Sequence, residues 1–375
     1  MTPLFIYGTL CHLPLLHSVL GRAPAASPAV LAGRAVYWAD AHDFPLIVDE
    51  PGGLARGLLL CDLTAEDMAR LDYYEGPFGY ETQGCTVETA DGARIAARVY
   101  VPEPGLWQPG DAWSLDDWAA RLGETIVITS KDVMALYPDP IAPKRRWPML
   151  VRGASRLRAA KGDPAVTRRK AMPGDVVVEA RTQPYANFFA VEEYELAFRR
   201  FDGGMSASVN RAAFVSGDAV TVLPYDPVRD RVLFVEQFRA GPYARGDAQP
   251  WQLEPIAGRV DPFETPEEAA HREAEEEAGL ALGELISIGS YYPSPGAKTE
   301  FLTSFIALAD LPDEAAIIGG VASEAEDIKG HILSFADFAA LVARGEATNA
   351  PLLISYYWLA RERPRIMAEA AGTKM

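Results

Sequence analysis

The sequence has few of the residues on which zinc sites and disulfide frameworks depend. Its 375 residues include three cysteines, Cys11, Cys61 and Cys85, which form no CxxC pair, and five histidines, none at metal-ligand spacing. An odd number of cysteines in a long chain argues against both kinds of cross-link. We therefore expect neither a disulfide framework nor a structural zinc ion.

Long hydrophobic runs are also missing. Spanning a bilayer takes roughly 20 consecutive apolar residues, and charges, prolines and glycines interrupt every candidate stretch. The N-terminus runs directly into the apolar segment Leu4-Phe5-Ile6-Tyr7, without the basic region or cleavage site of a signal peptide. We expect a cytoplasmic protein that has no membrane partner.

Basic residues are too few to balance the acidic ones. The chain has 35 Lys and Arg against 52 Asp and Glu, a formal net charge of −17. Such a charge repels a polyphosphate backbone, so we expect no nucleic-acid partner. A small phosphate compound can still bind through a cation.

The length and the charge distribution predict two unlike domains. A chain of 375 residues exceeds the usual size of a single hydrophobic core. Basic residues gather between Lys144 and Lys170, with prolines on both sides of a helix-compatible stretch at about 149–160. We interpret this stretch as a solvated connecting helix. The predicted domains are residues 1–140 and 173–375, joined by a basic linker at 141–172.

A helix is predicted at about 266–278 from its end signals. Thr265 is a good N-cap, Pro266 suits the first helical position, and Glu268 completes a capping box. Gly279 supplies a left-handed C-terminal cap. The sequence therefore marks both ends of this helix.

Three glutamates share one face of that helix. Glu273, Glu276 and Glu277 stand at positions i, i+3 and i+4, so their carboxylates project from nearly the same side. Such a cluster is tolerated on a solvated face, or is stabilised by a hard divalent cation such as Mg²⁺ or Mn²⁺. The spacing alone leaves both interpretations open.

The stretch from Gly258 to Leu280 resembles the Nudix signature. Eight positions are in register: Gly258, Glu264, Arg272, Glu273, Glu276, Glu277, Gly279 and Leu280. The resemblance implies an α/β/α sandwich in which the three helix glutamates, with the Ala257 carbonyl, bind Mg²⁺ or Mn²⁺. It also implies that Arg272 pairs with Glu264 to hold the loop against the helix.

Segments outside the signature resemble the ADP-ribose pyrophosphatase branch of that family. They include YANFFAVEEYEL, LPYDPVRDRVLFVEQFR, WQLEPIAG, YPSPGAKTE and ASEAEDI. The resemblance implies that Arg239 and Arg211 contact the diphosphate or ribose and that Phe188 or Phe189 stacks on adenine. It makes Glu324 the general base and Glu326 a further metal ligand. The implied products are AMP and ribose 5-phosphate, formed by a homodimer with exchanged N-terminal strands.

The N-terminal half carries a different pattern. A strand, LFIYGTL, ends at Gly8, and LDYYEGPFGYE puts Glu75 at the end of a helix-like segment, before the strand Arg94–Pro102. This order resembles the γ-glutamylcyclotransferase-like family, which implies a small β-barrel-like fold with helices. Carried over, the substrate loop is Tyr7, Gly8, Thr9 and Leu10, and Glu75 is the catalytic carboxylate. A capping or solvent-facing Glu75 is the alternative.

The sequence thus predicts a two-domain α+β and α/β protein. We expect metal-dependent hydrolysis of ADP-ribose or a related nucleoside diphosphate sugar in the C-terminal domain. The N-terminal domain is either a γ-glutamyl cyclotransferase that releases 5-oxoproline or a module that senses a nucleotide or peptide.

Overall fold

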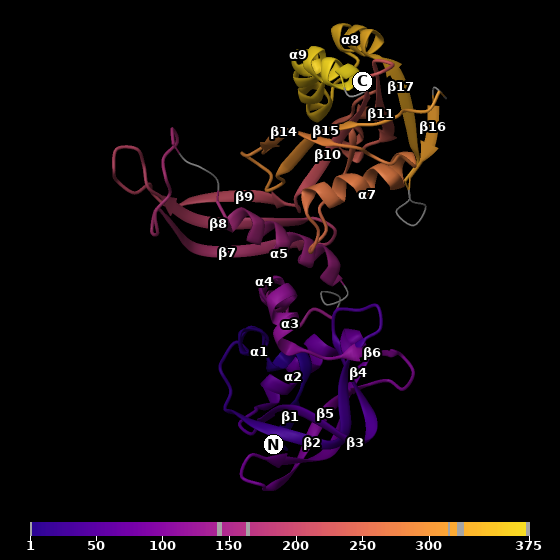
Figure 1. The fold of residues 1–375 in the computed structure, drawn as a ribbon. Helices are drawn as coiled ribbons and strands as arrows, with labels where there is room; N and C mark the ends of the chain where they lie inside the picture. Colours follow the sequence, from indigo (N-terminus) through magenta and orange to yellow (C-terminus); the bar gives the residue numbers. More distant parts are fainter. Residues whose placement is uncertain (1, 141–144, 163–165, 314–315, 321–325, 373–375) are drawn as a thin grey trace. The chain divides into compact units, whose positions relative to one another are not determined.

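The computed structural model divides the chain into two compact units. It describes residues 2–140, 145–162, 166–313, 316–320 and 326–372, and the units are Met1–Lys161 and Gly162–Met375 (Figure 1). The described helices contain none that is long and apolar enough to cross a membrane. The domain limits at residues 140 and 172 stay predictions.

The first unit is built on a closed ring of five strands. The ring runs β3-β1-β5-β4-β2 and closes by a pairing of β2 with β3, while β6 adds to β2. All neighbours are antiparallel except β1 and β5. The barrel-like N-terminal architecture is therefore confirmed. The strands are β1 (Leu4–Ile6), β2 (Ala26–Ala39), β3 (Pro45–Leu60), β4 (Tyr80–Thr89), β5 (Arg94–Pro102) and β6 (Pro109–Ala112).

Helices cover part of this barrel. Leu15 and Leu16 of one helix and Leu71 of another are buried in a common core with the strands. The helices are α1 (Leu13–Leu20), α2 (Ala65–Glu75), α3 (Leu115–Trp118), α4 (Glu124–Ala135) and α5 (Arg146–Ala160).

Helix α5 covers the helix-compatible stretch of the basic segment and packs within the first unit. Met149 of α5 and Val133 of α4 are buried against each other. Arg152 of α5 is only 2% exposed, so the expectation of a solvated arginine face is wrong at this position. The apolar residues between the arginines decide which side of α5 turns inward.

The second unit contains a mixed sheet of eight strands. Its main order is β14-β15-β10-β11-β17-β16, with β12 beside β11 and β13 beside β10. Only β10 and β15 are parallel among these pairs. The strands are β10 (Ala219–Asp226), β11 (Arg231–Phe238), β12 (Trp251–Glu254), β13 (Ile256–Arg259), β14 (Leu285–Tyr291), β15 (Leu302–Leu308), β16 (Ala316–Gly319) and β17 (Ile328–Ser334).

Helices lie on both faces of this sheet (Figure 1). Val220 and Val222 of β10 belong to the core that includes the alanines of α7. Leu223 and Tyr225 point the other way, into the core formed with α8 and α9. Successive side chains of β10 therefore contribute to two separate cores, one on each face of the sheet. The helices are α6 (Ala240–Arg245), α7 (Pro266–Ala278), α8 (Phe335–Ala343) and α9 (Ala350–Gly372).

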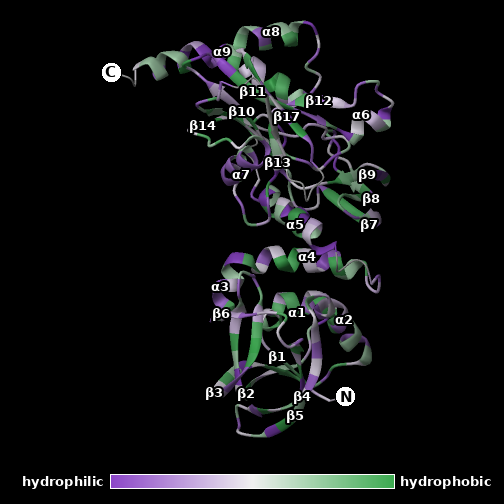
Figure 2. Ribbon diagram, turned by 90° about the vertical axis from the view of Figure 1, so that its right-hand side faces the viewer, coloured by the Kyte–Doolittle hydropathy of each residue, from purple (hydrophilic) through white to green (hydrophobic). Residues whose placement is uncertain are grey.

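A second, three-stranded sheet precedes the large one in the chain. It is the antiparallel sheet β7-β8-β9, with β7 at Val176–Ala186, β8 at Ala190–Phe198 and β9 at Val209–Val215. Figure 2 shows hydrophobic stretches along these strands. Val176, Val177 and Val178 are 57%, 48% and 50% exposed, so this chain leaves an apolar edge uncovered.

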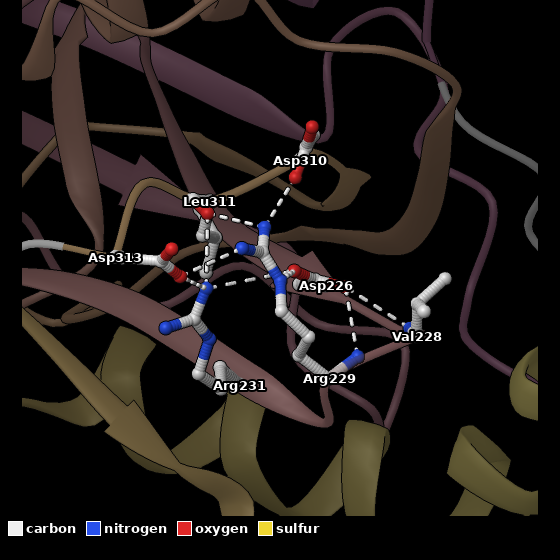
Figure 3. Close-up of polar contacts among 7 residues, drawn as sticks. All are labelled: Asp226, Val228, Arg229, Arg231, Asp310, Leu311 and Asp313. Carbon is white, nitrogen blue, oxygen red and sulfur yellow. Dashed lines mark hydrogen bonds and ion pairs between the residues drawn. The ribbon is translucent and has the colours of Figure 1, made fainter.

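An arginine network fastens the turn between β10 and β11. Arg229 donates from Nε to Asp226 at 2.5 Å and from Nη1 to Asp313 at 3.0 Å. Its Nη2 also donates to the Asp310 carboxylate and the Leu311 carbonyl (Figure 3). The buried Asp226 thus pairs with Arg229, which ties this turn to the segment after β15, and it also lies 3.9 Å from Nη2 of Arg231.

Candidate functional site

Helix α7 has the ends that its sequence predicts. It spans Pro266–Ala278, with a reciprocal capping box between Thr265 and Glu268 and a left-handed Gly279 at its end. The prediction of this helix is confirmed at both ends. The caps set the register that places the three glutamates relative to the preceding loop.

The backbone of strand β13 packs directly against the carboxylates of α7. A Cβ atom at Gly258 would lie 1.8 Å from the Glu273 carboxyl group, so any larger residue would displace this carboxylate from its present position. The Ala257 amide donates to Oε2 of Glu277 at 3.3 Å. Backbone groups of residues 257 and 258 and two carboxylates of α7 therefore meet at one place.

Arg272 connects the loop before α7 to the helix. Its Nε and Nη2 donate to the two carboxylate oxygens of Glu264 at 2.9 and 3.0 Å. The predicted pair of Arg272 and Glu264 is confirmed. Arg272 Nη1 also donates to Glu273 at 2.7 Å and to Glu276 at 3.0 Å, so one guanidinium balances three acids.

Burial makes two of these carboxylates costly to ionise. The pKa of Glu277 is raised to about 8, chiefly by desolvation and in smaller part by the charges of Glu273 and Glu326. Desolvation also raises the pKa of Glu273 to about 7, against the opposing effect of Arg272. A divalent cation with oxygen ligands relieves this kind of repulsion. The donor set therefore fits a hard cation.

The carboxylates are not gathered into a metal cluster in this structure. Within the described ranges, no three Asp, Glu, His or Cys side chains converge as ligands of one ion. Arg272 holds Glu273 and Glu276 instead, while Glu277 is 2% exposed beneath β13. The expected base, Glu324, lies outside the described residues.

Of the two arginines expected to bind substrate, one lies within reach of the carboxylates. Arg239 follows β11 and makes two hydrogen bonds to Glu254, at 2.9 and 2.6 Å. The charges of Glu277 and Glu326 also act on it. Arg211 lies on β9, opposite Tyr194, and makes no hydrogen bond to the acids of α7 among the described contacts.

The aromatic pair at the turn between β7 and β8 contacts a residue that the sequence did not single out. Phe188 is exposed, whereas Phe189 packs on Phe214 with ring centroids 4.6 Å apart. The Arg259 guanidinium lies 3.8 Å from the centroid of Phe188. The Arg259 carbonyl also accepts from Arg272 at 2.9 Å, so this residue joins the aromatic turn to α7. In the sequence, only the position of Arg259 directly after Gly258 pointed to a place in the site.

The first unit brings its predicted loop into a tight turn. Gly8 has φ +66, and a Cβ there would lie 2.1 Å from Cγ of Pro45. Gly8 begins a short 3-10 helix, Gly8–Cys11, that contains Thr9 and the buried Leu10. Tyr7, just before it, is 8% exposed. Glycine is therefore required here by both conformation and space.

Glu75 ends α2 in an apolar environment beside this loop. Desolvation raises the pKa of its carboxyl to about 7, although the charge of Arg146 opposes the rise. Its charge in turn adds to the effect of burial in raising the pKa values of Tyr7 and Tyr80. Tyr7, Glu75 and Tyr80 therefore interact, and Glu75 is half-buried rather than exposed. The sequence pattern assigns Arg146 to the basic linker at 141–172, and not to this site.

Comparisons with known proteins match the two units to different families. Residues 4–120 match the model described as gamma-glutamyl cyclotransferase, AIG2-like, and residues 215–355 match the NUDIX domain model. The ADP-ribose pyrophosphatase of Escherichia coli (strain K12) is 38% identical over 185 residues, 49% of this chain and 88% of the relative. That of Haemophilus influenzae is 35% identical over 187 residues, 49% of this chain and 86% of the relative. A GDP-mannose pyrophosphatase of Pectobacterium atrosepticum is 34% identical over 170 residues, 45% and 85% of the two chains.

The raised pKa of Glu75 predicts a pH dependence of stability. In the unfolded chain the carboxyl ionises near its ordinary value of 4.5, whereas in the folded chain it stays protonated up to about pH 7. The contribution to the free energy of unfolding is therefore fully present below pH 4.5 and is lost as the pH rises to about 7. Glu75→Gln, which cannot ionise, should flatten this loss in urea titrations across that range.

Glu66→Gln, which changes an exposed acid of the same helix, is the matched control and should keep the wild-type slope. An unchanged slope in Glu75→Gln would contradict the buried environment of this carboxyl.

Proposed function

Because this chain belongs to the Nudix family and is a Nudix pyrophosphohydrolase, we propose that it hydrolyses the diphosphate bond of ADP-ribose to AMP and ribose 5-phosphate. Related nucleoside diphosphate sugars are the wider substrate class. The observation that carries the proposal is the pair of desolvated carboxylates, Glu273 and Glu277, under the backbone of Gly258. Such a site favours a bound cation and a substrate that carries negative charge.

In the proposed site, the groups that would hold Mg²⁺ or Mn²⁺ are Glu273, Glu276, Glu277, Glu326 and the carbonyl of Ala257. The chemistry supplied by a divalent ion there is neutralisation of the diphosphate charge and polarisation of the phosphoryl oxygens. Glu264 positions Arg272, which in turn orients Glu273 and Glu276. Glycine at 258 keeps the carboxylate of Glu273 within reach of the loop.

The remaining residues act as the general base and bind the substrate. Glu324 takes the proton of the attacking water as general base. Arg239, which Glu254 orients through two hydrogen bonds, contacts the diphosphate or the terminal ribose, and Arg211 joins it. The exposed ring of Phe188 stacks on the adenine base.

Replacing one buried carboxylate should separate chemistry from folding. We expect Glu277→Gln to lower kcat/KM for ADP-ribose by about 100-fold or more, since a ligand charge is lost where the diphosphate is activated. The measurement is AMP release with Mg²⁺ or Mn²⁺, across ADP-ribose and GDP-mannose, with thermal unfolding as a check on the fold.

Glu275→Gln is the matched control, because Glu275 is exposed on the same helix and has no assigned role. It should retain wild-type turnover. Full activity of Glu277→Gln would disprove the metal assignment, and a preference for GDP-mannose would overturn the base recognition assigned to Phe188. Chelation of the metal should abolish turnover, and adding the metal back should restore turnover.

We also propose that a second copy of the chain covers the exposed edge at Val176 to Val178. The apolar side chains there are half exposed in one chain, and burying them supplies the driving force for association. The expected state is a homodimer formed through the C-terminal unit, and Val177→Lys should shift the mass measured by light scattering toward the monomer. Val228→Lys, at another exposed valine, should not; a monomeric wild type would end this proposal.

A second candidate function belongs to the first unit. Glu75, with a pKa of about 7, is suited to accept a proton near neutral pH. In a γ-glutamyl compound, Glu75 takes a proton from the α-ammonium group, and the freed amine attacks the γ-carbonyl. The new C–N bond closes 5-oxoproline, and the former amide nitrogen leaves as an amine with the proton.

The test of this candidate is release of 5-oxoproline from γ-glutamyl amides. Glu75→Gln should abolish it, whereas Glu66→Gln should not. Saturable binding without product would instead assign the unit to ligand sensing. The cytoplasmic location stays a prediction, which cell fractionation tests.

A further inference from the structure

Helix α5 adds an arginine to the surroundings of Glu75. It lies beyond residues 4–120, which match the cyclotransferase-like family. Arg146, its first residue, donates from Nη2 to the Tyr74 hydroxyl at 2.5 Å. The guanidinium carbon lies 4.6 Å from the ring centroid of Tyr74 and 4.8 Å from that of Phe78. Two aromatic rings on either side of Glu75 in sequence therefore hold this cation in place.

The site contains the carboxyl group of Glu75 and the guanidinium of Arg146, which form no ion pair with each other. The charge of Arg146 acts on Glu75, but no ion pair joins the two among the described residues. Arg146 is half-buried, like Glu75. Two separated, opposite charges near apolar rings are complementary to a zwitterion. The two charges of such a ligand compensate Glu75 and Arg146 for the hydration that each loses on burial.

A third polar group, the Tyr7 hydroxyl, lies beside them. Its side chain is 8% exposed, and its interaction with the Tyr80 hydroxyl lowers the pKa of Tyr80 against the effect of burial. A phenol hydroxyl can both donate and accept, so a ligand can serve as a further partner. The charge of Glu75 acts on Tyr7, so this hydroxyl belongs to the same site.

We infer that Arg146 binds the α-carboxylate of a γ-glutamyl ligand while Glu75 receives its α-ammonium group. This assignment rests on the second proposed function and adds to it the residue that selects the ligand. Arg146 is then a specificity-determining residue: it takes no part in bond making, and its guanidinium offers further N–H donors beyond the one given to Tyr74. The segment that leads to the Nudix unit thereby completes the site of the barrel.

A pair of probes isolates the charge that Arg146 recognises. One is N-butyl γ-L-glutamyl amide with a free α-carboxylate, and the other is its α-methyl ester. Both can release butylamine from the same bond, but only the acid can pair with Arg146. For the full-length protein, we expect kcat/KM to favour the acid by on the order of 10- to 100-fold, the range for a charged hydrogen bond, after subtraction of the enzyme-free rate.

Arg146→Gln should bring the acid-to-ester ratio close to one, chiefly through KM for the acid, with the ester little changed. Arg146→Lys should recover part of the preference, because it restores the charge without the planar fork. Lys131→Gln removes a positive charge from an exposed position on α4 and should keep the wild-type ratio.

A purely structural role for Arg146 predicts a different pattern, in which Arg146→Gln lowers both rates equally and leaves the ratio unchanged. That outcome overturns the inference while leaving the cyclotransferase proposal intact. If neither probe is turned over, calorimetric titration with the same pair decides. Binding of the acid over the ester that depends on Arg146 upholds the inference and ends the cyclotransferase proposal, whereas no binding overturns both.

Discussion

The close approach of β13 to α7 is the constraint on which the second unit's site depends. At Gly258 no side chain separates the strand backbone from the Glu273 carboxylate. At the same place the Ala257 amide donates to Glu277, and desolvation raises the pKa values of both Glu273 and Glu277. Arg272 then keeps the acidic helix from repelling its own loop. A polar group is costly to bury unless it is compensated, and here the compensation comes from one guanidinium and one amide.

The two units use the same physical device in different folds. In each, a glycine allows the backbone to come within contact distance of another group, at Gly258 and at Gly8. In each, a buried carboxyl near that turn keeps its proton at pH values where an exposed acid has lost it. A nearby arginine lowers the cost without removing it. The units differ in what they leave exposed, since the second alone carries the apolar edge at Val176 to Val178.

Local signals were reliable wherever a single residue sets a backbone conformation. The caps at Thr265 and Gly279 predict both ends of α7. The pairing of Arg272 with Glu264 was implied by the resemblance to the Nudix signature, and the hydrogen bonds between them confirm it. The basic segment is different. Arginines in such a run are typical of a solvated face, but Arg152 is buried because α5 packs on α4. Composition reports the average polarity of a segment, whereas packing decides which of its side chains turns inward.

The sequence by itself determined the two-part organisation, the helix that carries Glu273, Glu276 and Glu277, and the placement of Glu75 at a helix end, because caps, prolines and glycines act over a few residues. Only the tertiary structure decided the surroundings of those groups. Arg259 reaches Phe188, and Arg146 reaches Tyr74, across 71 and 72 positions of the chain. Such contacts form when separate elements pack, and no local pattern encodes them.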